Sequence, residues 1–193
     1  MIVLAVHDYI FKVVLIGDGA VGKTSLRLQY MGKGFSATYL MTIGADFAVA
    51  PVTINYDNHN YSCKLQIWDL AGQPRFKEVR SLFYQGAYGA LAVYDKTRYD
   101  TYEHVIDWVN EVIKNRGKIP MVLLGNKKDI CDDQAGMITC IGYDEGVRLA
   151  KKLSEMLGFE IPFYETSAKT GENVNEAFTV LTQAMVANAL KKK

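Results

Sequence analysis

Cysteine and histidine are scarce in this sequence, which has three of each among 193 residues. The cysteines, Cys63, Cys131 and Cys140, form no C-x-x-C pair. We therefore expect reduced thiols, as in a cytosolic protein, with a Cys131–Cys140 bridge as the less favoured alternative. The histidines stand in unrelated contexts without the spacing of metal ligands. These shortages argue against a disulfide-stapled scaffold and against a histidine metal site.

A strong charge of one sign and a long apolar run are also missing. The formal net charge is +1, so no overall field favours nucleic acid as a partner. No run approaches the roughly 20 apolar residues that span a membrane. The sequence predicts a cytoplasmic protein with at most peripheral membrane contact.

Targeting and lipidation signals are absent as well. The segment MIVLAV is too short for a signal peptide and lacks a basic leader, and Ile2 is not the glycine that myristoylation requires. The chain ends NALKKK, without a cysteine for prenylation. Either a lipidated tail has been removed or the protein works without a lipid anchor.

Composition and length predict one globular domain. Apolar residues make up 49% of the chain and charged residues 22%, as is usual for a protein with a packed core. No internal repeat or low-complexity linker divides it. We expect a monomeric single domain over residues 1–193, with a short N-terminal extension at 1–9 and a basic end at 189–193.

Short apolar runs alternate with helical patterns along the chain. The runs that predict central strands of a mostly parallel sheet are 11–16, 65–68, 89–94, 121–125 and 161–164. The run 45–54 contains Pro51, which cannot donate to a strand ladder, so we expect an edge strand there. The turn-like YDNHN predicts a hairpin between this strand and the next.

Helical patterns fill the intervals between these runs. Apolar faces predict helices around 105–112, 149–157 and 174–185, the first with Asp100 and Glu103 as a capping pair and Gly117 as its stop. This alternation predicts a doubly wound α/β fold of the P-loop type. Six strands, one of them an antiparallel edge strand, would carry helices on both faces. Ligands bind beyond the carboxyl ends of the strands in such sheets.

The stretch GDGAVGKTSL, residues 17–26, matches the pattern GxxxxGK[ST]. Gly17 and Gly22 let backbone N–H groups turn toward a phosphate, and the following helix adds its positive dipole end. Lys23 can bridge the β- and γ-phosphates, and Thr24 offers a hydroxyl to Mg²⁺. A chance glycine-rich turn is a poor explanation, because the motif lies between a predicted strand and a predicted helix. The motif alone does not choose between ATP and GTP.

Two later segments make that choice. GNKKD closes the fourth central strand, and YETSAK closes the last. Asp129 can accept hydrogen bonds from guanine N1–H and N2–H₂, a donor pair that adenine lacks. Asn126 would tie this loop to the glycine-rich loop, and the Lys127 stem would lie along the base. The backbone N–H of Ala168 would donate to guanine O6.

The motifs together resemble those of the Ras superfamily of small GTPases, over roughly residues 10 to 188. The Rab branch is the most similar, through TIGADF at 42–47, KLQIWDLAGQPRF at 64–76 and FYQGA at 83–87. The resemblance implies a Mg²⁺-dependent switch between GTP and GDP whose conformation effectors read. It also implies a role in vesicle or membrane traffic.

The resemblance assigns roles in hydrolysis. Thr42 would contact Mg²⁺ and the γ-phosphate, and the N–H of Gly72 would contact the γ-phosphate. Gln73 would orient the attacking water. With Lys23, these residues form the expected catalytic set. Loss of the γ-phosphate would release both segments.

The resemblance also implies the ligand sets. Thr24, Thr42 and Asp69 would hold Mg²⁺, Phe35 would cover the guanine and Tyr39 the phosphates. The expected nucleotide contacts are Gly17, Asp18, Gly19, Ala20, Val21, Gly22, Lys23, Thr24, Ser25, Phe35, Tyr39, Thr42, Asn126, Lys127, Asp129, Ser167, Ala168 and Lys169.

Partners follow from the same resemblance. Phe47, Trp68 and Phe83 stand where Rab proteins place a hydrophobic triad read by effectors, although ordinary core packing is the alternative. No inserted helical domain supplies a catalytic arginine, so a GTPase-activating protein is expected. A nucleotide exchange factor is expected too, because so complete a site should release GDP slowly.

Some residues depart from the family pattern or carry no role. Pro74 follows Gln73, where many Rab-like chains have an acidic residue, and restricts Gln73 to extended backbone. Lys96 and Lys128 are expected to be solvated surface charges. Two other functions remain open: a P-loop ATPase or nucleoside kinase, and a pseudo-GTPase that binds GTP with little hydrolysis.

Overall fold

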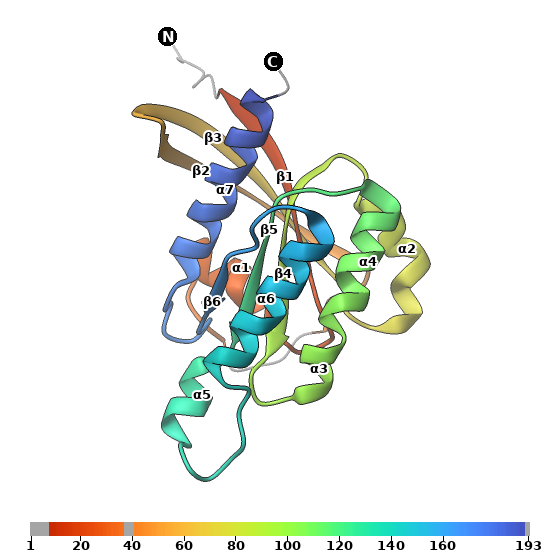
Figure 1. The fold of residues 1–193 in the computed structure, drawn as a ribbon, viewed down its shortest axis with the longest axis vertical. Helices are drawn as coiled ribbons and strands as arrows, with labels where there is room; N and C mark the ends of the chain where they lie inside the picture. The colour runs from red at the N-terminus through yellow and green to blue at the C-terminus, as the bar shows by residue number, and fades with distance from the viewer. Residues whose placement is uncertain (1–7, 37–40, 192–193) are drawn as a thin grey trace.

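The computed structural model describes residues 8–36 and 41–191 (Figure 1). The strands are β1 (Tyr9–Ile16), β2 (Ala45–Tyr56), β3 (His59–Leu70), β4 (Ala87–Asp95), β5 (Met121–Asn126) and β6 (Phe163–Glu165). They form one sheet in the order β2-β3-β1-β4-β5-β6. The β2–β3 pair is antiparallel and the other pairs are parallel, which confirms the predicted fold class.

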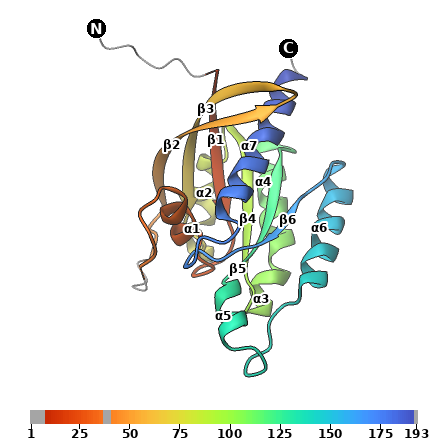
Figure 2. The same cartoon turned by 90° about the vertical axis from the view of Figure 1, so that its left-hand side faces the viewer.

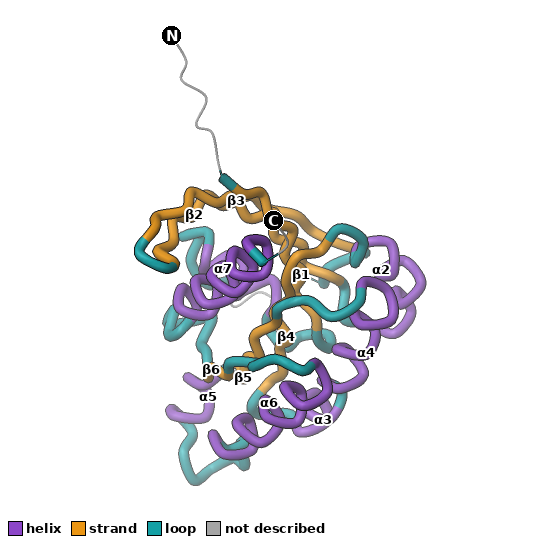
Figure 3. The backbone as a smooth tube through the Cα atoms, turned by 45° about the horizontal axis from the view of Figure 1, so that its top comes forward, coloured by secondary structure: helices purple, strands orange, loops and turns teal. Residues whose placement is uncertain are grey.

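Helices cover both faces of this sheet (Figure 3). The helical elements are α1 (Lys23–Tyr30), η1 (Pro74–Phe76), α2 (Lys77–Phe83), α3 (Tyr99–Glu103), α4 (Val105–Arg116), α5 (Lys128–Asp133), α6 (Tyr143–Leu157) and α7 (Val174–Leu190). Alternate residues of β1 face opposite sides, because side chains alternate along a strand. Val13 packs in the core under α1 and α7, whereas Val14 packs in the core under α4 and α6. Burial on both faces explains why the second half of β1, residues 13–16, is an unbroken apolar run.

The β2–β3 hairpin forms as predicted. Tyr56 pairs with His59, and the turn residues Asp57 and Asn58 have φ angles of 52° and 58°. Asp and Asn tolerate this left-handed conformation, which a two-residue hairpin turn requires. Pro51 of β2 lies opposite Lys64 of β3. In the described sheet β2 pairs only with β3, so it is the predicted edge strand. Figure 2 shows α5 at the end of the molecule away from this turn.

The predicted capping pair is wrong. Asp100 and Glu103 lie within the short helix α3, and neither α3 nor α4 has a side-chain cap. The turn after β4 is closed instead by Thr101, whose hydroxyl accepts from the Asp95 N–H at 3.0 Å and donates to the Arg98 carbonyl at 2.7 Å. The chain therefore needs no carboxylate cap where it enters α4. The predicted stop at Gly117 is correct, and α6 likewise ends at Gly158.

The expectation of three reduced thiols is wrong. Cys131 and Cys140 form a disulfide with their Cα atoms 6.1 Å apart, and Cys63 is free and buried. The return of the chain after α5 brings the two residues together, which their spacing alone does not reveal. Burial raises the pKa of the Cys63 thiol to about 11, so this thiol is protonated near neutral pH.

The expectation of a solvated Lys96 is also wrong. Its side chain is buried at the end of β4 and pairs with Glu165 at the end of β6. Lys128 is partly buried and pairs with Asp132 at 2.6 Å and Glu172 at 3.2 Å. The compensating carboxylate is on β6, which is two strands from β4 in the sheet, so the sequence around Lys96 contains no sign of it. Within residues 8–36 and 41–191, no helix combines the length and apolarity needed to cross a membrane.

Candidate functional site

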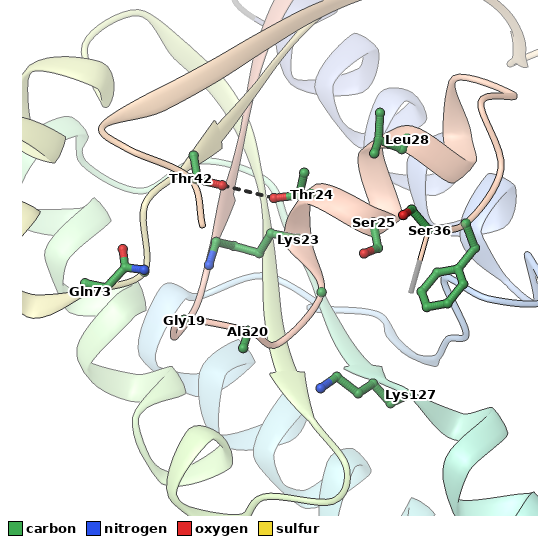
Figure 4. Close-up of a pocket in the computed structure, with 13 residues that line it drawn as sticks. Gly19, Ala20, Lys23, Thr24, Ser25, Leu28, Ser36, Thr42, Gln73 and Lys127 are labelled. Carbon is green, nitrogen blue, oxygen red and sulfur yellow. Dashed lines mark hydrogen bonds between the residues drawn. The ribbon is translucent and has the colours of Figure 1, made fainter. Parts of the chain in front are cut away.

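A cavity of about 330 Å³ opens where the carboxyl ends of β1 and β3 meet the start of α1 (Figure 4). It lies at the sheet edge where ligands of doubly wound folds bind. Its lining residues are Gly19, Ala20, Gly22, Lys23, Thr24, Ser25, Leu28, Phe35, Ser36, Thr42, Gly72, Gln73 and Lys127. Four segments that are far apart in sequence therefore share one cavity.

The glycine-rich loop turns into α1 at Gly22, which has a φ of 100°. A Cβ atom there would lie 2.2 Å from the side-chain nitrogen of Asn126, so both the backbone conformation and the close contact require glycine. Asn126 donates to the Val21 carbonyl at 2.8 Å and accepts from the Ala168 N–H at 3.2 Å. This is the tie predicted for Asn126. It joins the loop after β1 to the loops after β5 and β6.

The ammonium group of Lys23 lies against this loop. It donates to the carbonyls of Gly17 at 2.7 Å and Asp18 at 2.8 Å. Burial lowers the pKa of Lys23 to about 8, against the opposing effect of Asp69 and Asp18. A buried cation without a full ionic partner would gain from an anion in the cavity, which Lys23 faces (Figure 4).

Three oxygen-bearing side chains meet beside Lys23. Thr24 donates to the Asp69 carboxylate, Thr42 lies 3.3 Å from the same oxygen, and the two hydroxyls are 3.1 Å apart. The other Asp69 oxygen is buried without a hydrogen-bond partner. Burial raises the pKa of Asp69 above its ordinary value, while Lys23 opposes this shift. Hard oxygen donors with an uncompensated buried carboxylate oxygen suit Mg²⁺. The described residues hold no cluster of three or more His, Cys, Asp or Glu side chains that would suit a metal.

The loop after β3 forms the opposite wall. A Cβ atom on Gly72 would lie 2.3 Å from the carbonyl carbon of Asp18, so this loop packs directly on the backbone of the glycine-rich loop. Gln73 has φ −77° and ψ 140°, the extended conformation expected before Pro74. The side-chain oxygen of Gln73 is buried without a partner. The carboxamide therefore has an acceptor that no described protein group uses.

The loops after β5 and β6 meet at the other end of the cavity. Ser167 donates to Asp129 at 2.6 Å, and Lys169 lies 3.9 Å from the second Asp129 oxygen. Lys127 lines the cavity and pairs with the buried Asp95 at 2.7 Å. The structure thus brings NKKD and ETSAK together. The lining residues do not include Asn126, Asp129, Ser167, Ala168 and Lys169.

Three other residues are predicted to contact the nucleotide: Phe35, Tyr39 and Asp18. Phe35 lines the cavity and is half exposed. Tyr39 lies outside the described residues. The Asp18 side chain is directed out of the cavity, toward α4, where it accepts from the Trp108 ring N–H at 2.7 Å and contacts His104 at 2.7 Å. Sequence analysis missed both partners, because they lie 90 and 86 positions from Asp18 and belong to no motif.

The three residues of the predicted hydrophobic triad lie together on the β2–β3 hairpin and α2. Phe47 pairs directly with Trp68 across the strands, with ring centroids 5.1 Å apart. Trp68 and Phe83 are 5.4 Å apart. Phe47 is 46% exposed, so the cluster presents an aromatic surface beside the loops that carry Thr42 and Gln73.

Comparison with known proteins gives a consistent result. A sequence model of the Ras family matches residues 12–187. The Ras-related protein RIC1 of Oryza sativa subsp. japonica is 37% identical over 176 residues, which cover 91% of this chain and 80% of the relative. The Ras-related protein RABD2b of Arabidopsis thaliana is 37% identical over 180 residues, covering 93% and 82%. The Ras-related protein Rab-1 of Theileria annulata is 36% identical over 181 residues, covering 93% and 76%.

The contact between His104 and Asp18 predicts a pH-dependent contribution to stability. The hydrogen bond between the His104 ring and Asp18 raises the pKa of His104, so folding favours the protonated ring. This contribution is fully present below about pH 6 and is lost as pH rises through the raised pKa. We expect His104→Ala to destabilise the protein more at about pH 5.5 than at about pH 8.5 in urea unfolding.

The matched control is His59→Ala, because His59 lies at the β2–β3 turn, remote from Asp18. Its effect on stability should change little over the same pH interval. An equal loss of stability at both pH values in His104→Ala would contradict the prediction.

Proposed function

The chain belongs to the Ras family of small GTPases, and we propose that it binds GTP and GDP with Mg²⁺ in the cavity described above and slowly hydrolyses GTP. One observation carries this proposal. The Asp69 carboxylate, buried beside Thr24, Thr42 and Lys23, has an oxygen without a partner, and the Gln73 loop closes against the same cavity. Such an arrangement suits a metal-bound phosphate chain more than any neutral ligand.

The base end supports guanine as the specific ligand. Asp129 is nearly buried and is held by Ser167, so its carboxylate has a fixed direction. Two donors on guanine would complete the hydrogen bonding of the Asp129 carboxylate, whereas adenine lacks this donor pair and would lose these bonds at a cost on the order of 1–3 kcal/mol. This contrast disfavours the ATPase and nucleoside kinase alternatives.

The phosphate end supports hydrolysis by positioning and charge stabilisation. Thr24, Thr42 and Asp69 would hold Mg²⁺, which neutralises charge on phosphate oxygens when bound. Gln73 lines the cavity, and its unused oxygen, once the side chain turns toward the γ-phosphate, can accept a hydrogen bond from a water molecule that attacks the γ-phosphorus in line. The bond to the β–γ bridging oxygen then breaks, giving GDP and inorganic phosphate. Lys23 stabilises the charge on the transferred group.

The same contacts would make the protein a switch. Thr42 and Gly72 would lose their γ-phosphate contacts after hydrolysis, and both lie close to the ends of β2 and β3. Phe47, Trp68 and Phe83 stand on the adjoining surface, which we assign to effectors. An activating protein and an exchange factor would act on the same two loops. The Rab-type segments suggest membrane traffic as the process served, with peripheral membrane contact.

Single-turnover hydrolysis of GTP loaded on the purified protein tests this proposal. We expect conversion to retained GDP with a half-time on the order of tens of minutes to hours. Nucleotide extracted from the protein and separated by chromatography gives the rate. GTP that persists unchanged would favour the pseudo-GTPase alternative, with Pro74 as the first residue to replace.

Asp129→Asn should weaken guanine nucleotide binding selectively. The carboxamide turns one acceptor into a donor that faces the donors of guanine, so we expect about 10- to 100-fold weaker GDP binding. Asp132→Asn, on the same helix but paired with Lys128 at the surface, is the matched control. Competition between GTP and ATP for a fluorescent nucleotide measures both. Unchanged GDP affinity in Asp129→Asn would argue against the assigned base site.

Gly19→Val should separate binding from stimulated hydrolysis. A Cβ atom at Gly19 makes ordinary contact with the Gln73 side chain at 3.7 Å, so the fold accommodates it. The rest of the side chain would fill the space that Gln73 and an arginine of an activating protein need. We expect GDP affinity close to that of the wild type and loss of stimulated turnover. Normal stimulated turnover in this variant would contradict the assignment, and Gln73→Leu should behave like Gly19→Val.

A further inference from the structure

The guanidinium group of Arg80, on α2, is almost completely buried. Its Nε and Nη2 atoms donate to the two carboxylate oxygens of Glu111 at 2.9 and 3.1 Å. Its Nη1 atom donates to two backbone carbonyls, those of Ala71 at 3.0 Å and Gln73 at 2.8 Å. Arg80 therefore uses both edges of its planar group, one toward α4 and one toward the loop after β3.

Side chains around Arg80 fix its orientation. Glu111, which is also largely buried, accepts a hydrogen bond from the Tyr84 hydroxyl at 2.8 Å. The Trp108 ring lies 4.3 Å from the Arg80 carbon Cζ, in cation–π geometry. The carboxylate of Glu111 compensates the charge, and the ring and the hydroxyl remove the freedom to rotate. Figure 1 shows α2 and α4 side by side, as this arrangement requires.

The two carbonyls that Arg80 holds lie on either side of Gly72. They fix the path of the backbone from Ala71 to Gln73, where Pro74 already restricts Gln73 to an extended conformation. The direction of the Gln73 side chain follows from that backbone. An error of about 1 Å in a catalytic group can cost about 100-fold in rate, so the backbone position matters.

Helix α4 holds the other wall of the cavity as well. Trp108, which stacks on Arg80, donates its ring N–H to Asp18 in the glycine-rich loop. One helix thus positions Asp18, next to Gly19, and Gln73 relative to each other. Gly72 packs on the Asp18 backbone between them.

We infer that Arg80 is a positioning residue for GTP hydrolysis: through the Ala71 and Gln73 carbonyls, and anchored by Glu111, it sets the place of the Gln73 side chain. This inference rests on the proposed function, because it assigns a role to Arg80 only in that reaction. Arg80 lines no part of the nucleotide cavity, so it acts through Gln73.

Arg80→Lys tests this inference most directly. Lysine keeps the positive charge beside Glu111, but its single ammonium group cannot reproduce the planar fork that bonds a carboxylate and two carbonyls together. We expect single-turnover GTP hydrolysis about 10-fold slower than in the wild type, with GDP affinity changed less than about 3-fold. Glu111→Gln should cause a loss in the same direction, because it removes the carboxylate that anchors Arg80. Arg116→Lys is the matched control. Arg116, which lies on α4 with Glu111, also donates to a backbone carbonyl, that of Ala87 at 2.7 Å, so its replacement should leave the rate unchanged.

A double-mutant cycle with Gln73→Leu separates positioning from a general structural effect. If Arg80 acts through Gln73, then Arg80→Lys should change the rate less than about 2-fold when Gln73 is already leucine. Thermal melting and retention of GDP establish that each variant is folded. If Arg80→Lys does not fold, Glu111→Gln in the same cycle takes its place.

The outcomes distinguish this inference from the proposed function. If the wild type hydrolyses GTP and the folded variants Arg80→Lys and Glu111→Gln hydrolyse it at the same rate, the inference is overturned and the proposed function stands. An equal loss with and without Gln73 also overturns it, because Arg80 would then act independently of that side chain. Absence of hydrolysis in the wild type overturns the proposed function and the inference together.

Discussion

The buried carboxylate of Asp69 at the end of β3 is the interaction on which the site depends. A buried charge is costly unless it is paired and hydrogen-bonded. Thr24 and Thr42 contact this carboxylate, the charge of Lys23 acts on it, and one of its oxygens still has no partner. The start of α1 and the segment before β2 are thereby drawn to the same point. This surplus of acceptor suits the Mg²⁺ ion and the phosphates of the proposed function.

The rest of the molecule holds the loops around that point. Asn126 connects the glycine-rich loop to the loops after β5 and β6, and so couples the two ends of the cavity. Helix α4 performs a similar task on the opposite side through Trp108 and Glu111. Both connections use buried polar groups whose partners come from distant segments. Such networks define one geometry when they are fully satisfied, which a site that works by positioning requires.

Most of the fold could be predicted because its signals are local. Apolar runs buried on both faces, Pro51 at the edge and Asp57–Asn58 in the turn each act through the conformation of their own segment. The predictions that are wrong concern partners from elsewhere in the chain. Lys96 is buried because Glu165 lies beside it, and Cys131 pairs with Cys140 because the chain returns after α5. Solvation and pairing are properties of the assembled molecule, so no local pattern reveals them.

The same division applies to function. The sequence by itself determined the family, the fold class and the residue types at the site, because the motifs that identify the family are short segments whose spacing follows from backbone geometry. The tertiary structure decided how these motifs are held. The Asp18 carboxylate faces α4 instead of the cavity, and Arg80, which belongs to no motif, holds the carbonyl of Gln73. Contacts of this kind depend on where helices pack on the sheet, and that arrangement exists only after the whole core has formed.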